Sequence, residues 1–204
     1  MKKLPSLTVA LCLTGCVQTV ALQGELHPAN PIPNKSVEAV GVVCTEDLLS
    51  HRAHGWNGLV AYQLEVGQSL CSGLVEATKG AYRAASTSIE PYKGQYARVI
   101  KYDLARSTLG FESLPDGSTR VSYGVEVVVA KYDRDLRFES RNVVSGNALV
   151  DGNSCSRAEC VQKATAAALQ EVVDKTTGFL VAGLGDQPRQ GKKAAKAPKA
   201  AKKK

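Results

Sequence analysis

Residues 119–132 read TRVSYGVEVVVAKY, and this stretch decides the fold. Apolar side chains recur at every second position, which is the pattern of a β-strand with one face toward a core. The turn sequence Pro115-Asp116-Gly117 precedes the stretch, and Asp133-Arg134-Asp135 follows it. We therefore expect the best-defined strand of a sheet here. Its buried face is predicted to carry Val121, Tyr123, Val125, Val127 and Val129.

Strands are predicted on both sides of this stretch. Residues 98–111 alternate at first and then lose phase before Leu109, as a bulged strand would. In residues 136–144, charged positions alternate with less polar ones, which predicts a strand with one wet face. Short turns join the three strands, so they are expected to form an antiparallel meander.

One helix is predicted before the meander and one after it. A β-branched strand at residues 37–44 comes first, and residues 68–85 then carry apolar side chains at helical spacing. Residues 157–180 form the last helix, which opens with a capping box made by Ser156 and Glu159. The order strand, helix, three-stranded antiparallel meander, helix predicts an α+β fold with the helices packed on one face of the sheet.

The chain opens with a secretory signal at residues 1–15. Two lysines precede an apolar stretch of about ten residues, which is too short for a bilayer, since crossing one needs about 20. Leu13-Thr14-Gly15-Cys16 resembles the lipobox of bacterial lipoproteins. That resemblance implies cleavage before Cys16 and several acyl chains on it, such as palmitate, which hold more firmly than one chain. The alternative is an ordinary signal peptide with a chance cysteine.

The residue after the cysteine bears on which membrane holds the protein. Val17 stands where aspartate is the usual signal for retention in the inner membrane. The resemblance therefore implies the periplasmic face of the outer membrane. The expected partner at this end of the chain is the membrane itself, through lipid on Cys16.

Segments of biased composition flank the predicted domain, residues 36–184. Residues 16–35 are rich in Pro and Asn and are expected to be an extended tether between the lipid and the domain. Residues 185–204 are mostly Lys, Ala and Pro with no large apolar side chain, which predicts a disordered tail.

The tail accounts for the basic character of the chain. The net charge is +7, but Arg189 and seven tail lysines supply eight positive charges, and Lys2 and Lys3 supply two more. The region between is thus mildly acidic, at −3. Such tails resemble those that contact nucleic acid by neutralising phosphates, and lipopolysaccharide or cell-wall polymers are nearer polyanions for an exported chain. A solubilising tail with no fixed partner is the alternative. The residues predicted to contact a polyanion are Lys192, Lys193, Lys196, Lys199, Lys202, Lys203 and Lys204.

Four cysteines remain in the predicted domain, and an even number outside the cytosol predicts disulfides. Cys155 and Cys160 fall on the two positions around the N-cap Ser156 that contact each other in a hydrophobic staple. Cys44 and Cys71 are both expected to face the core. We therefore predict the pairs Cys155–Cys160 and Cys44–Cys71, with four reduced thiols as the alternative.

Patterns for catalysis, cofactors or metals are weak. Neither the dinucleotide-binding pattern nor the P-loop occurs, so no cofactor is expected. His51 and His54 could be combined with Cys155 and Cys160 as zinc ligands, but the spacing fits no known zinc pattern. No nucleophile motif lies near either histidine, so the chain is not expected to be an enzyme. A hydrolase that uses one of these histidines is a third hypothesis.

The single tryptophan lies between the predicted strand at residues 37–44 and the first helix. Trp56 is expected to pack in the core. The alternative is an exposed aromatic edge that contacts a partner protein or lipid.

The order of elements is similar to that of small bacterial envelope lipoproteins. That group includes the auxiliary lipoproteins of ABC-type transport systems and the lipoprotein partner of the lipopolysaccharide translocon. The resemblance rests on the lipobox, the Val-rich strand 121–129, the following Tyr132-Asp133-Arg134-Asp135, and Ala148 before an Ala-rich helix. It implies a non-catalytic binding or assembly role, with an envelope protein complex or a lipid-like molecule as partner. The basic tail and the four cysteines depart from that group, so a polyanion-binding anchor is the second hypothesis.

Overall fold

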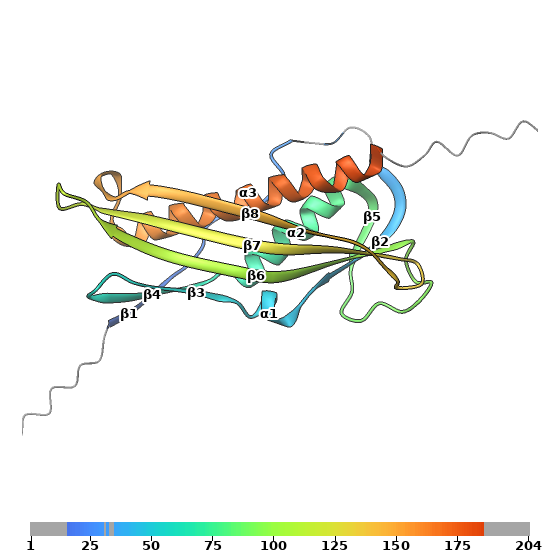
Figure 1. Ribbon diagram of the computed structural model, residues 1–204, viewed down its shortest axis with the longest axis horizontal. Helices are drawn as coiled ribbons and strands as arrows, with labels where there is room; N and C mark the ends of the chain where they lie inside the picture. Colours follow the sequence, from blue (N-terminus) through green and yellow to red (C-terminus); the bar gives the residue numbers. More distant parts are fainter. Residues whose placement is uncertain (1–15, 31, 33–34, 186–204) are drawn as a thin grey trace, which may run out of the picture.

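The computed structural model describes residues 16–30, 32 and 35–185. The described chain forms strands in two sheets, with helices packed beside them (Figure 1). In chain order the elements are β1 (Cys16–Val20), β2 (Ser36–Cys44), α1 (Glu46–Leu49), β3 (Arg52–Trp56), β4 (Val60–Glu65), α2 (Gly67–Ala81), β5 (Tyr82–Thr87), β6 (Arg98–Ser113), β7 (Thr119–Asp133), β8 (Phe138–Asp151), the 3₁₀ turn η1 (Gly152–Ser154) and α3 (Arg157–Gly185).

The larger sheet has the strand order β5-β2-β6-β7-β8. Strands β6, β7 and β8 pair antiparallel in sequence order, which confirms the predicted meander. The register of β6 shifts between Leu104 and Arg106, which confirms the predicted bulge. Strand β2 lies parallel to both of its neighbours, β5 and β6.

One face of this sheet is buried under the two long helices. The five alternating side chains predicted for the buried face of β7 are all at most 1% exposed. Helix α3 packs on β7 and β8, while α2 lies beside α3 and contacts β2 and β5 (Figure 1). The α+β class, with helices on one sheet face, is therefore confirmed. The alternation in β7 produces this arrangement because it gives the sheet a single apolar face to cover.

The start of α3 has the predicted capping box. The Ser156 N–H donates to Glu159 Oε2 at 2.8 Å, and the Glu159 N–H donates to Ser156 Oγ at 3.4 Å. Hydrogen bonds from the backbone and the side chain of Ser156 lower the pKa of the Glu159 carboxyl because they favour its charged form. Two backbone donors that the first turn of the helix cannot satisfy thus find partners.

Helix α2 is shorter than its sequence predicts. It ends at Ala81, and the alanines that follow belong to β5 instead. In that strand Ala84 pairs with Ala39 and Ala85 with Val40 of β2. Helix propensity is a weak preference, and pairing that covers the edge of β2 outweighs it here.

The smaller sheet has the strand order β1-β4-β3 and was not predicted from the sequence. Strands β3 and β4 form an antiparallel hairpin, and β1 adds to β4 in parallel. Its inner face lies on β6 at Gly55, where a Cβ atom would overlap the side chains of Leu109 and Phe111. The sequence of β3, Arg-Ala-His-Gly-Trp, does not look like a strand because it contains a glycine. That glycine allows close packing on β6 and does not mark a turn.

The segment expected to be an extended tether packs on the domain in the structure. Residues 16–20 are β1, and the following residues run along α3. There Gln162 donates a hydrogen bond to the backbone oxygen of Ala21 at 3.0 Å, and the Ala29 N–H donates to Asp174 Oδ1 at 2.8 Å. Apolar side chains before and between the prolines supply the physical reason, because Leu22, Leu26 and Ile32 pack against the core. Residues 1–15, predicted to be the signal, lie outside the described residues.

Candidate functional site

The two faces of the smaller sheet differ in chemistry. The inner face carries Ala53, Tyr62 and Leu64, which are at most 3% exposed. Side chains that are direct partners across strands lie on the same face, so the register also defines the outer face. That face has three rows, and they change from apolar to charged along the strands.

The apolar row lies next to the start of β1. Val17 pairs with Ala61, which pairs with Trp56. Val17 is 62% exposed and Trp56 is 57% exposed. The prediction that Trp56 packs in the core is wrong. Strand β3 places this side chain on the outer face of the smaller sheet, and only the inner face of that sheet is buried.

The other two rows are polar. The middle row consists of Thr19, Gln63 and His54. The last row holds Arg52 and Glu65, whose Nη2 and Oε1 atoms form an ion pair at 2.9 Å. Polarity therefore rises steadily with distance from the start of β1.

The tip of the β3–β4 hairpin extends the apolar row. Gly58 turns the chain with φ of +90°, a backbone conformation that favours glycine. Asn57 Oδ1 accepts hydrogen bonds from the N–H groups of Leu59 at 3.0 Å and Val60 at 2.8 Å. Leu59 is 73% exposed on this ordered tip. Large apolar side chains thus stand in solvent on a well-defined turn.

Cys16, the predicted lipid site, is the first residue of β1 and pairs with Val60 at the start of β4. The predicted anchor position and the hairpin tip are therefore neighbours (Figure 1). Helix α3 ends at Gly185 at the opposite end of the molecule. The seven lysines predicted to contact a polyanion, residues 192–204, lie outside the described residues.

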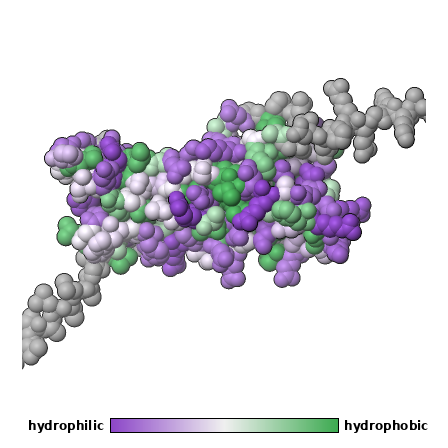
Figure 2. Space-filling view, viewed as in Figure 1, coloured by the Kyte–Doolittle hydropathy of each residue, from purple (hydrophilic) through white to green (hydrophobic). Residues whose placement is uncertain are grey.

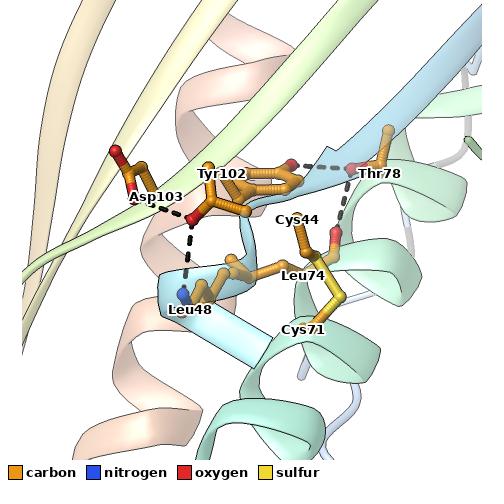
Figure 3. The surroundings of a disulfide bond; sticks show 8 residues. Cys44, Leu48, Cys71, Leu74, Thr78, Tyr102 and Asp103 are labelled. Carbon is orange, nitrogen blue, oxygen red and sulfur yellow. Dashed lines mark hydrogen bonds between the residues drawn. A yellow bond between two sulfur atoms is a disulfide. The ribbon is translucent and has the colours of Figure 1, made fainter. Parts of the chain in front are cut away.

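A second feature is an open groove beside a disulfide. The disulfide joins Cys44 to Cys71 with an S–S distance of 2.06 Å (Figure 3), and it is one of the two pairs predicted from the sequence. The groove has a volume of about 810 Å³ and is mainly apolar. Ile89, at 93% exposure, and Leu49 line it together with Val42 and Val43. An apolar groove with an exposed isoleucine at its edge is a candidate contact site.

The groove exists because β5 stops before β2 does. Thr87, the last residue of β5, pairs with Val42, so the final two residues of β2 have a strand neighbour on the β6 side only. Helix α1 follows β2 directly and forms another wall through Leu49. The last residues of β2 therefore line the groove.

Hydrogen bonds hold the walls of the groove in place. Thr45 Oγ1 donates to Asp103 Oδ1 at 2.7 Å and accepts from the Leu48 N–H at 3.3 Å, which fixes α1 on β6. Beneath it, the hydroxyls of Tyr102 and Thr78 are 2.7 Å apart and tie β6 to α2 (Figure 3). Full burial raises the pKa of Tyr102, so this phenol stays neutral. The groove is a preformed surface.

The second expected disulfide joins Cys155 to Cys160 with an S–S distance of 2.10 Å. It spans the first turn of α3, next to the capping box of Ser156 and Glu159. Its sequence separation of 5 residues makes it a local staple of the helix start. Both cysteines are therefore occupied in a role other than metal binding.

His51 lies between the two sheets. Its Nε2 atom shares a 2.6 Å hydrogen bond with Ser107 Oγ of β6. Burial, and secondarily the nearby charge of His54, lower the pKa of His51. Within the part of the chain that the structure describes, no three His, Cys, Asp or Glu residues are grouped to hold a metal ion. A histidine–serine pair of this kind connects two layers.

The outer face of the larger sheet is polar around a small apolar patch, as Figure 2 shows. Glu126 forms an ion pair with Arg106 at 3.9 Å, and Arg120 forms one with Asp151 at 2.7 Å. A shallow hollow of about 320 Å³ lies between these strands. Exposed ion pairs of this kind contribute little stability. The hollow is a weaker candidate site than the outer face of the smaller sheet.

Comparisons with known proteins identify the fold. No protein family model matches the sequence, and no curated protein matches it either. Protein XCC0632 from Xanthomonas campestris, of the DUF330 family, has a similar structure with a TM-score of 0.57 at 17% identity, covering 83% of this chain and 98% of that one. A minor lipoprotein from Acinetobacter baumannii gives a TM-score of 0.44 at 10% identity, covering 74% of this chain and 96% of that one. The chain therefore shares the fold of XCC0632.

Proposed function

We propose that this chain is an exported lipoprotein of the bacterial envelope, anchored by lipid on Cys16, whose domain binds a partner protein without catalysing a reaction. The groove beside the Cys44–Cys71 disulfide is the observation that carries the binding role. The lipobox carries the anchor. The outer membrane is the proposed location, on the grounds that Val17 follows the lipidated cysteine.

A further observation supports an exported protein. Disulfides persist in oxidising compartments such as the periplasm, and the domain has two of them. No helix among residues 16–30, 32 and 35–185 combines the length and apolar character needed to cross a membrane.

The groove suits a protein segment. It is open along the surface, lined by aliphatic side chains, and edged by Glu46 and Lys101, which could pair with charges on a partner. Because its walls are already held in place, binding costs little conformational entropy in the groove, and such preorganisation favours affinity. An apolar segment of an envelope protein is thus the proposed occupant.

The anchor is tested by membrane fractionation of the full chain. Wild type should enter the detergent phase, while Cys16→Ser should leave the membrane or stay unprocessed. The matched control is Cys12→Ser, which removes a cysteine of the signal and should behave as wild type. Retention in the membrane of a Cys16→Ser chain that has lost residues 1–15 would exclude the lipid anchor.

The groove is tested by photo-cross-linking in intact cells from a reactive residue at position 89. We expect one discrete adduct with an envelope protein, and Leu49→Glu should abolish it. The control is the same reactive residue at position 143, where Val143 is 50% exposed on β8, away from the groove. An adduct of equal yield from both positions, unaffected by Leu49→Glu, would count against binding in the groove.

A further inference from the structure

The apolar end of the smaller sheet is an interaction surface that the groove and the proposed anchor leave unexplained. We infer that the β3–β4 hairpin tip docks on the lipid bilayer beside Cys16, so that the domain is held in one orientation on the membrane. This inference rests on the proposed lipid anchor. Its surface is defined by Val17, Trp56 and Leu59.

The apolar side chains lie next to the proposed anchor. Cys16 pairs with Val60, so Leu59 stands one residue beyond the predicted anchor point on the neighbouring strand. Trp56 pairs with Ala61, and Ala61 pairs with Val17, the residue after Cys16. A lipid on Cys16 would bring the bilayer surface to this end of the sheet, and this row of side chains would meet it.

The polarity of the smaller sheet also changes in the direction that a membrane surface requires. On the outer face of the smaller sheet, the row nearest Cys16 is apolar, the next is polar, and the farthest holds the ion pair of Arg52 and Glu65. A surface that enters a membrane interface needs this order, since apolar groups gain by leaving water and charged groups do not. Tryptophan is also a residue enriched at membrane–water interfaces.

The hairpin tip is also held in one conformation. Asn57 fixes the turn by accepting two backbone hydrogen bonds, and Gly58 provides the conformation the turn requires. Trp56 and Leu59 are therefore held out in solvent and do not fold back onto the domain, although their burial would be favourable. The bilayer next to Cys16 offers that burial.

Docking has a consequence for the rest of the molecule. Helix α3 and strands β6 to β8 run from the β1 end to the opposite end, where α3 finishes at Gly185 (Figure 1). With the hairpin tip on the bilayer, the long axis points away from the membrane. Figure 2 shows apolar residues at the β1 end of the molecule, which is the end that would meet lipid.

The single tryptophan makes the test direct, since Trp56 is the only intrinsic tryptophan reporter. The full chain is expressed, extracted in detergent, and reconstituted in phosphatidylcholine vesicles with brominated acyl chains, which quench nearby indoles. We expect Trp56 emission to shift to shorter wavelength and to be quenched at least twofold relative to unbrominated vesicles.

The matched control moves the reporter to the far end of the sheet. Phe138 is 60% exposed at the start of β8, so a Phe138→Trp reporter in a Trp56→Phe background should remain unquenched. Vesicle-bound protein in which Trp56 is no more quenched than this control would overturn the docking while leaving the anchor intact.

Failure of the anchor is recognised separately, because the protein would then not float with the vesicles at all. In that case a maleimide phospholipid is attached to Cys16 of the processed chain, whose other cysteines are held in disulfides. Quenching of Trp56 in this conjugate would support the docking surface, and absence of quenching would overturn it.

Discussion

The two sheets of this protein differ in the side chains that their uncovered faces present to solvent. On the larger sheet the alternating residues of β7 lie under α3, and the uncovered face is mostly polar. On the smaller sheet the buried face is similar, but the uncovered face presents Trp56 and Val17 to solvent. The larger sheet also exposes apolar side chains, since Phe138, Val143 and Leu149 of β8 are at least 50% exposed. The apolar row of the smaller sheet differs in its position, because it lies next to Cys16, and this position directs attention to the β1 end.

The largest effect should come from placing the same new charge in the two regions. Val127→Asp puts a carboxylate among fully buried side chains under α3, and an unpaired buried charge costs about 3–5 kcal/mol. Trp56→Asp places it in solvent, where substitutions change stability by about 0.5 kcal/mol or less. Denaturant unfolding of both variants measures the contrast. Comparable losses in the two variants would mean that Trp56 packs in the core after all.

The disulfides should differ next. Cys44–Cys71 has a sequence separation of 27 residues, and its loss should cost about 3.5 kcal/mol in the loop-entropy account. Cys155–Cys160, with a separation of 5, should cost about 2 kcal/mol. Thermal unfolding of the two double alanine variants tests the order. A larger loss from the shorter loop would show that native contacts of the staple at the start of α3, and not chain entropy, set the effect.

A smaller effect should follow from the buried hydroxyl pair behind the groove. Tyr102→Phe removes the hydrogen bond to Thr78, whose hydroxyl keeps its second bond to the Leu74 carbonyl oxygen at 2.9 Å. The expected loss of stability is about 1 kcal/mol, with no change in the yield of the cross-link from position 89. Loss of that cross-link at unchanged stability would show that the pair shapes the groove directly.

The smallest effect concerns pH. The pKa of His51 is lowered in the folded chain, so the unfolded chain binds this proton first as the pH falls. The stability contributed by neutral His51 is present above its unfolded pKa of about 6.5 and is lost as the pH falls through the lowered folded value. The melting temperature should therefore fall more between pH 8 and pH 5 in wild type than in His51→Gln. Parallel pH profiles would contradict this role.

The elements that could be predicted from sequence are those with strict periodicity. The alternation of residues 121–129 and the capping box of Ser156 and Glu159 correctly located β7 and the start of α3. The cysteine positions also predicted the two disulfide pairs that the structure contains, because the staple geometry is local and Cys44 and Cys71 lie on elements that pack together.

The candidate surfaces were harder to predict because they depend on pairing between distant segments. The hairpin was concealed by Gly55, which packs against β6, and β1 gains strand structure only by pairing with β4. The groove depends on where β5 stops along β2, which no local pattern specifies. The Asn57-Gly58 turn sequence was the one available signal for the hairpin, since this pair favours tight turns.

The lipid anchor proposed for Cys16 places the start of the mature chain beside the apolar row of Val17 and Trp56. Mass spectrometry of the N-terminal peptide, taken from the membrane fraction of cells that express the full chain, is the measurement to make first. We expect a peptide that starts at Cys16 and carries acyl chains on that residue. A peptide that retains residues 1–15, or an unmodified Cys16, would rule out the lipid anchor.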